Sequence, residues 1–176
     1  MDAQEKATLL TRLEAGKRAM LEVLNGVTED EAARNPASGR WSILQCLEHL
    51  AASEDYLFMQ ILAARSSEAP MVNEKREALI LSQSLDRTKA VESPQMARPV
   101  GRFSTLAQAL DHFLDARERT LRFVESCEAD LRSRITTHPI VGTVNCYENL
   151  LTIAMHPLRH AKQIDECKSA LSQLNG

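Results

Sequence analysis

The sequence predicts an all-α fold, a four-helix bundle with a long crossover connection between helices 2 and 3. No segment alternates apolar and polar residues long enough to indicate a strand, and aromatic residues make up only 4% of the chain. Four stretches of about twenty residues carry apolar side chains at helical spacing, each on one face. Such helices bury their apolar faces against one another, and a chain of 176 residues can do so within one domain, which we predict over residues 1–176.

The first long helix is predicted over residues 2–24, and Gly26 marks its end. A polar turn with a short helix near residues 28–34 follows. The inward face of the long helix consists of Leu9, Leu13, Met20 and Leu24.

The second long helix begins at Ser42, which has capping-box spacing to Gln45, and should reach about Arg65, with Trp41 packed over its first turn. Its inward face consists of Ile43, Leu47, Leu50, Leu57 and Ile61. The crossover then extends from Ser66 to Gly101 and contains three prolines and a helical stretch at residues 73–82. A connection of this length usually covers a surface or a site.

Two further capping patterns start the remaining helices, which should cover residues 105–128 and 145–174. Thr105 precedes Gln108 by three residues, and Asn145 precedes Glu148 by three. The inward face of the third helix consists of Leu106, Leu110, Phe113, Leu121 and Val124. The second, third and fourth long helices therefore each have a starting signal.

Composition excludes several classes of function. The net charge is −3 with basic and acidic residues intermixed, so no basic stripe indicates nucleic-acid binding. The four cysteines form no Cys-x-x-Cys unit and are typical of small buried residues in a reducing cytosol. No stretch is long and apolar enough to cross a membrane, and the N-terminus lacks the apolar region of a signal peptide. We therefore expect a cytoplasmic protein that binds neither nucleic acid nor membrane.

Two histidines at positions i and i+4, His156 and His160, are the strongest functional signal. They lie one turn apart on the apolar face of the last helix, where two imidazoles can converge on one cation. Two neutral core histidines are the alternative interpretation. A metal site needs a third ligand, and the residues alone leave two candidates, His49 on the second helix and His112 on the third, each of which lies off the main apolar face of its helix.

Two charged residues, Glu54 and Arg117, fall where apolar residues are expected. Buried charges should be paired, so we predict a structural ion pair between them in the bundle interior. Glu54 as a partner of the metal site, and escape of either side chain to solvent at a helix edge, are the alternatives. Among other polar residues near the motif, His138 is predicted to be a turn residue and Arg159 a surface or interface residue, and thiolate ligation by a cysteine is not expected.

Several short motifs in a fixed order resemble a known family. They are Trp41-Ser42-Ile43-Leu44, Leu47-Glu48-His49-Leu50 with Glu54, His138-Pro139-Ile140-Val141-Gly142, and His156-Pro157-Leu158-Arg159-His160 with Gln163-Ile164. Together they resemble the DinB-like superfamily, in particular its bacterial, YfiT-like metal-binding branch. The likeness covers the second helix, the loop before the fourth and the fourth helix itself.

The resemblance implies a divalent metal ion, nickel or zinc, bound by His49, His156 and His160, and so favours His49 over His112. It also implies a metal-dependent enzyme that acts on a small molecule, either a hydrolase or a transferase of a low-molecular-weight thiol such as bacillithiol or mycothiol, and a homodimer. No catalytic residue is assigned, and Pro157 in place of glutamate excludes the His-Glu-x-x-His arrangement of zinc proteases. A non-enzymatic metal-binding or stress-related bundle is the alternative, and an interaction module without metal is a third.

Overall fold

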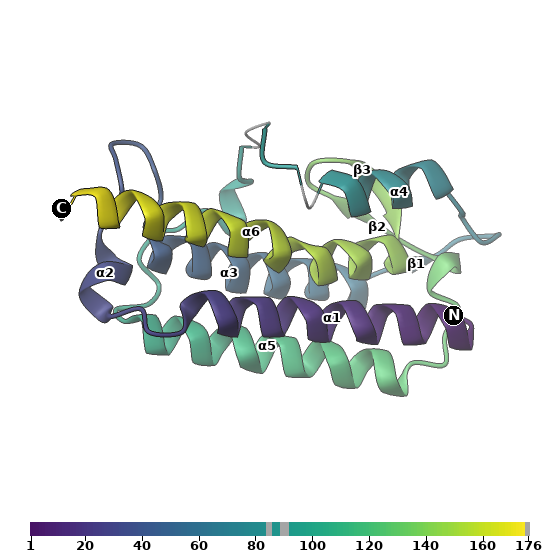
Figure 1. The fold of residues 1–176 in the computed structure, drawn as a ribbon. Coiled ribbons are helices and arrows are strands. Elements are labelled where there is room, and N and C mark those ends of the chain that lie inside the picture. Colours follow the sequence, from purple (N-terminus) through teal and green to yellow (C-terminus); the bar gives the residue numbers. More distant parts are fainter. Residues whose placement is uncertain (84–85, 89–91, 175–176) are drawn as a thin grey trace.

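Four long helices run along the length of the molecule: α1 (Ala3–Leu24), α3 (Ile43–Leu62), α5 (Leu106–Ser126) and α6 (Cys146–Leu174) (Figure 1). The computed structural model describes residues 1–83, 86–88 and 92–174. Helices α1 and α6 run in one direction and α3 and α5 in the other. Within each of these parallel pairs, the two helices pack extensively against each other. Because α3 and α5 are parallel, the chain must return along the whole bundle between them. The predicted bundle and the position of its crossover are confirmed.

The predicted capping signals explain where the helices begin. The Ser42 hydroxyl accepts from the backbone N–H of Gln45, whose side chain accepts from the N–H of Ser42. The same reciprocal pair joins Asn145 and Glu148 at the start of α6. At α5, Thr105 accepts from the N–H of Gln108. Each bond satisfies a backbone donor that the first helical turn leaves unpaired.

Besides the bundle, the described residues contain a small antiparallel sheet, which the sequence did not predict. Its strands are β1 (Arg65–Ser66), β2 (Arg134–His138) and β3 (Gly142–Asn145), in the order β1-β2-β3. Ile135 pairs with Arg65 on one side and with Asn145 on the other. The second long helix consequently ends at Leu62, earlier than predicted. Strands of two to five residues are too short to show an alternating pattern, so their pairing depends on contacts distant in sequence.

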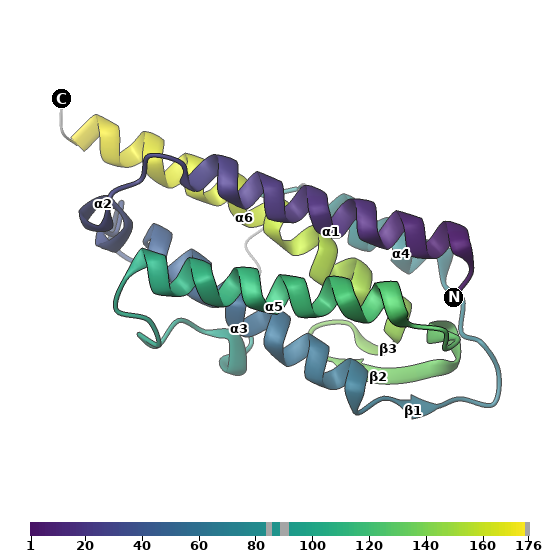
Figure 2. The same ribbon diagram turned by 90° about the horizontal axis from the view of Figure 1, so that it is seen from below.

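The short elements lie at the ends and along one side of the bundle (Figure 2). They are α2 (Glu29–Ala33), α4 (Glu74–Gln83), and two 3₁₀ turns, η1 (Gln95–Ala97) and η2 (Leu131–Ser133). Arg76 of α4 donates two hydrogen bonds of 2.8 Å to the buried carboxylate of Glu148 on α6. The predicted crossover helix is thus confirmed and is attached to the bundle, while residues 84–85 and 89–91 of the crossover lie outside the described residues. No helix in the described ranges is long and apolar enough to cross a membrane.

The predicted ion pair between Glu54 and Arg117 lies inside the bundle. Arg117 Nη2 donates to a Glu54 carboxylate oxygen at 2.8 Å, and the Thr120 hydroxyl donates to the other oxygen at 2.8 Å. Burial raises the pKa of Glu54 and lowers that of Arg117, because desolvation disfavours both charges, and each partner opposes the shift of the other. The pair is therefore stable only while both partners and the Thr120 hydrogen bond are present.

Pro157 explains why a buried arginine is needed at this level of the bundle. Proline has no N–H, so the carbonyl of Ile153, one turn earlier in α6, loses its helical hydrogen bond. Arg117 Nη2 donates to this carbonyl at 3.1 Å, while Nη1 donates to the Leu13 carbonyl of α1 at 3.3 Å. Helix α6 continues through the proline as one helix, directly beside His156.

A glycine lets α1 approach α6 at the same place. A Cβ atom on Gly16 would lie 2.9 Å from the carbonyl oxygen of Ala154 and 3.4 Å from Pro157 Cβ. The first distance is shorter than a carbon and an oxygen tolerate, so only glycine fits without a shift of one helix. Close packing at Gly16 and the Arg117 hydrogen bonds together fix α6 around Pro157.

Arg117→Ala should destabilise the protein by about 3–5 kcal/mol, because it leaves the Glu54 carboxylate buried without its charged partner and the Ile153 carbonyl unpaired. Urea denaturation followed by circular dichroism measures the difference. Arg122→Ala is the matched control on α5, since it breaks an exposed ion pair with Glu118 and should change stability by less than about 1 kcal/mol. Equal effects of the two substitutions would contradict the role of Arg117.

Candidate metal centre

Three histidines from two helices converge on one point in the bundle. His156 Nε2 lies 2.9 Å from His160 Nε2 and 3.3 Å from His49 Nε2. His49 comes from α3, and the other two come from consecutive turns of α6. Their candidate ligand atoms all lie within 4.8 Å of one another. The structure therefore brings together the three histidines that the resemblance selected.

The hydrogen bonds of His49 define which of its nitrogens faces the group. Its Nδ1 lies 2.8 Å from the backbone carbonyl of Ala97, which can only accept, so Nδ1 carries the proton and donates. Nε2 then has a free lone pair, directed at His156. A ligating histidine commonly donates its other N–H to a carbonyl in this way, which fixes its tautomer and ring orientation.

Two of the three nitrogen separations match those around a common cation. Ligand nitrogens at about 2.0–2.1 Å from one metal ion lie about 2.9–3.4 Å apart, for octahedral and tetrahedral angles respectively. The separations of His156 Nε2 from the other two Nε2 atoms, 2.9 and 3.3 Å, fall within this range. The Nδ1 atom of His160, on the other side of its ring, is buried and has no hydrogen-bond partner among the described residues.

Burial keeps all three imidazoles neutral. Desolvation lowers the pKa of His49, and it lowers the pKa values of His156 and His160 well below the usual range, with a further contribution from the neighbouring histidines. Neutral imidazole is the form that binds metal ions, so few protons compete for these sites at neutral pH. His49 and His160 are buried, whereas His156 is half-buried, so the group is accessible from the side of His156.

The end of the crossover covers the outer side of His49. Ser93 Oγ lies 3.2 Å from His49 Nδ1, and the Trp41 ring centroid lies 5.0 Å from that of His49. His49 is only 5% exposed. Although His49 lies off the main apolar face of α3, as the sequence predicted, it is buried because residues distant in sequence cover that side of the helix.

A buried glutamate holds this segment of the crossover in place. The Glu48 carboxylate accepts from the backbone N–H groups of Val100, Gly101 and Arg102, at 2.7 to 3.2 Å, and from Arg102 Nη1 at 2.9 Å. Glu48 precedes His49 in sequence, so the two side chains connect adjacent parts of the crossover to one turn of α3. This arrangement positions the Ala97 carbonyl against His49.

The remaining candidates lie outside the histidine group. His112 pairs with Asp55 at 2.7 Å on the surface. His138 ends β2, and its Nδ1 accepts from the N–H of Ile140, as expected for a turn residue. Among the described residues, no cysteine or carboxylate belongs with the three histidines to a group that could hold a metal ion. Arg159 was expected at the surface or an interface, and it donates to the backbone carbonyl of Asp86.

Sequence reasoning missed the residues that surround His49. The contact with Ala97 uses a backbone carbonyl, for which no side-chain pattern exists. Ser93 and Trp41 come from segments before and after α3, and only the path of the crossover brings them together. Glu48 belongs to the Leu47-Glu48-His49-Leu50 motif, and its place next to a candidate ligand was the one sequence feature that could have indicated its role.

The family model of the DinB superfamily matches residues 12–164. The chain belongs to the DinB superfamily. No curated protein matches it in sequence. The residues that the family model matches include all three histidines, and the resemblance inferred from the motifs is confirmed.

Two solved structures share the fold of this chain. YfiT from Bacillus subtilis, described as a probable metal-dependent hydrolase with an unusual four-helix bundle topology, has a TM-score of 0.62 at 14% identity and covers 98% of this chain and 90% of its own. TT2238, described as a four-helix bundle protein, has a TM-score of 0.58 at 22% identity and covers 92% of this chain and 98% of its own. At these identities the likeness establishes the fold.

Native-state alkylation should find Cys46 unreactive. Burial raises its pKa to about 12, so at pH 8 only about one thiol in ten thousand is a nucleophilic thiolate. Iodoacetamide labelling followed by peptide mass spectrometry should modify the half-buried Cys127 and leave Cys46 unmodified until the protein is denatured. Equal native-state labelling of Cys46 and Cys127 would show that a reactive thiol lies near the histidines.

Proposed function

We propose that this protein is a metal-dependent hydrolase of a small molecule, with one zinc or nickel ion bound by His49, His156 and His160. The observation that carries the proposal is the convergence of three neutral imidazole nitrogens at 2.9 and 3.3 Å. The description of YfiT as a probable metal-dependent hydrolase supports the same class of activity.

The number of protein ligands favours catalysis over a structural role. Structural zinc sites are closed by four protein ligands, whereas catalytic sites use three and leave a position for water or substrate. The bundle is held together by buried side chains and the Arg117 network, so it does not need a metal for its core. A divalent cation in this position supplies Lewis acidity and lowers the pKa of a coordinated water.

The protein residues around the site have distinct tasks. His49 is oriented by the Ala97 carbonyl, and the two α6 histidines are oriented by the helix that Arg117 stabilises. The surrounding apolar packing excludes bulk water from the far side of the imidazoles, while half-buried His156 marks the accessible side. Ligation is therefore set by rigid helices, and access is set by the crossover.

The nucleophile comes from outside the protein. Cys46 and Cys146 are buried with pKa values raised to about 12 and 11, so neither supplies a thiolate at neutral pH. Water gives hydrolysis, and a low-molecular-weight thiol gives the transfer reaction that the resemblance also implies. Product analysis of one activated ester, with and without added bacillithiol, distinguishes the two.

His156→Ala should abolish binding of one equivalent of zinc or nickel, because the remaining imidazoles cannot enclose the cation. Elemental analysis of protein purified without a histidine tag, followed by calorimetric titration with each metal, measures this. His112→Ala is the matched control, since that histidine lies on the surface with Asp55 and should leave binding unchanged.

Two outcomes would overturn parts of the proposal. If wild-type protein binds no metal, or if His156→Ala binds as much as wild type, the three-histidine site is wrong. If metal binds as expected but neither ester hydrolysis nor thiol transfer depends on it, the non-enzymatic metal-binding bundle is the correct reading.

A further inference from the structure

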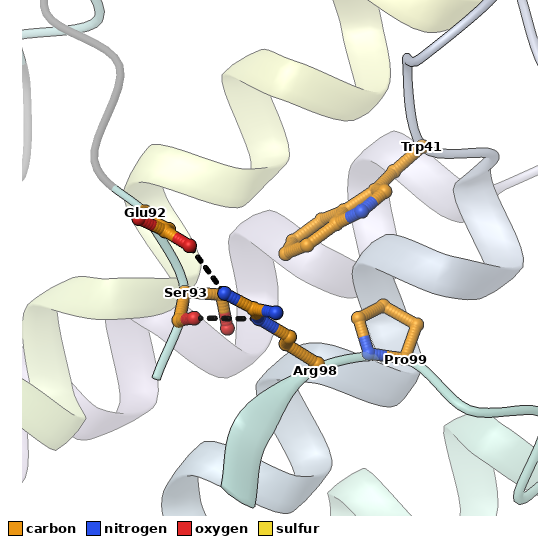
Figure 3. A pocket seen from close by; sticks show the side chains of 5 residues that line it. All are labelled: Trp41, Glu92, Ser93, Arg98 and Pro99. Atoms are coloured by element: carbon orange, nitrogen blue, oxygen red, sulfur yellow. Dashed lines mark hydrogen bonds and ion pairs between the residues drawn. The ribbon is translucent and has the colours of Figure 1, made fainter. Parts of the chain in front are cut away.

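A pocket of about 410 Å³ adjoins the histidine group and is lined by Trp41, Glu92, Ser93, Arg98 and Pro99 (Figure 3). Its volume lies within the range of about 300–1,000 Å³ that is usual for small-molecule sites. Two of its walls contact a proposed metal ligand, since Ser93 Oγ and the Trp41 ring both lie against His49. A molecule in this pocket would therefore lie against the Nδ1 side of His49, with the imidazole between it and the point where the three histidines converge.

The guanidinium of Arg98 is held in this pocket by its own chain segment. Arg98 Nε donates to the Ser93 carbonyl at 3.1 Å, and the Arg98 carbonyl accepts from Arg102 Nη1 at 2.8 Å. The backbone just beyond it is fixed by the Glu48 carboxylate. Arg98 thus presents a positive charge from a fixed position, on the opposite side of the pocket from the Trp41 ring in Figure 3.

The partner of Arg98 is itself a carboxylate. Arg98 Nη2 pairs with Glu92 Oε1, and the side chains are 50% and 84% exposed, respectively. An ion pair this exposed contributes little to stability, so another carboxylate can replace Glu92 at small cost. Glu92 therefore marks a carboxylate position that a ligand can take over.

We propose that Arg98 and Trp41 form a subsite for a small organic acid, and that Glu92 occupies the carboxylate position when no ligand is bound. Arg98 pairs with the ligand carboxylate, and the indole of Trp41 packs against its apolar body. The inference rests on the proposed function, because it names the substrate class of that site.

The single tryptophan of the chain makes this subsite directly measurable, because Trp41 alone supplies the indole fluorescence. Phenylacetate should change the fluorescence saturably, while phenylacetamide, its neutral analogue, should bind roughly tenfold more weakly. Arg98→Gln should raise the Kd for phenylacetate roughly tenfold. Glu92→Gln should lower it, because the competing carboxylate is removed. Arg122→Gln, at an exposed ion pair on α5, is the control and should change nothing.

Arg98→Gln and Glu92→Gln should change the Kd for phenylacetate in opposite directions. This difference distinguishes a ligand-binding role of the pair from a role in holding the crossover in place. If Glu92→Gln weakened binding as much as Arg98→Gln, the pair would only hold the crossover, and the proposal would be wrong. It would also fail if phenylacetate gave no saturable change, or if phenylacetamide bound equally well.

Repeating the titrations with metal-free and zinc-loaded protein separates this proposal from the proposed function. If the protein binds phenylacetate, with the Kd raised by Arg98→Gln and lowered by Glu92→Gln, and yet binds no zinc, the subsite is supported and the metal-dependent function is overturned. If the protein binds zinc but Arg98→Gln leaves the Kd for phenylacetate unchanged, the subsite is wrong and the metal site stands.

Discussion

Arg117 is a fully buried guanidinium that joins all four long helices at one level of the bundle. It extends from α5, pairs with Glu54 of α3, and donates to the carbonyls of Leu13 on α1 and Ile153 on α6. The Ile153 carbonyl is available only because Pro157 cannot donate to it. A helix irregularity that would otherwise leave a buried carbonyl unsatisfied is thereby used to fix the relative positions of the helices. A lysine could not make these divergent bonds, because it lacks the planar fork of arginine.

The histidine group depends on that constraint. His156 precedes Pro157, and His160 lies one turn further on, so the position of α6 at the proline determines where both imidazoles point. On the other side, Glu48 and His49 hold the end of the crossover against α3 through backbone N–H and carbonyl groups. The parallel arrangement of α3 and α5 requires this long crossover, and the crossover in turn supplies the walls of the pocket. Bundle topology and site architecture therefore have a common origin.

The sequence predicted what local patterns encode. Capping pairs such as Ser42 with Gln45 and Asn145 with Glu148 located the helix starts, and the i, i+4 spacing placed His156 and His160 on one face. The Glu54–Arg117 pair followed from two charges in apolar stripes. His49 could not be chosen over His112 from spacing, because its burial comes from the crossover. The strands and the Ala97 carbonyl contact were equally out of reach, since backbone pairing distant in sequence leaves no side-chain pattern.

The central claim is that this chain binds one cation through three imidazoles and through no other side chain. X-ray absorption spectroscopy of the zinc-loaded protein tests it most directly, because imidazole, oxygen and sulfur ligands differ in distance and scattering. The account predicts three imidazole nitrogens at about 2.0–2.1 Å, at least one additional light-atom ligand, and no sulfur. A sulfur ligand at about 2.3 Å, or fewer than three imidazoles, would contradict it.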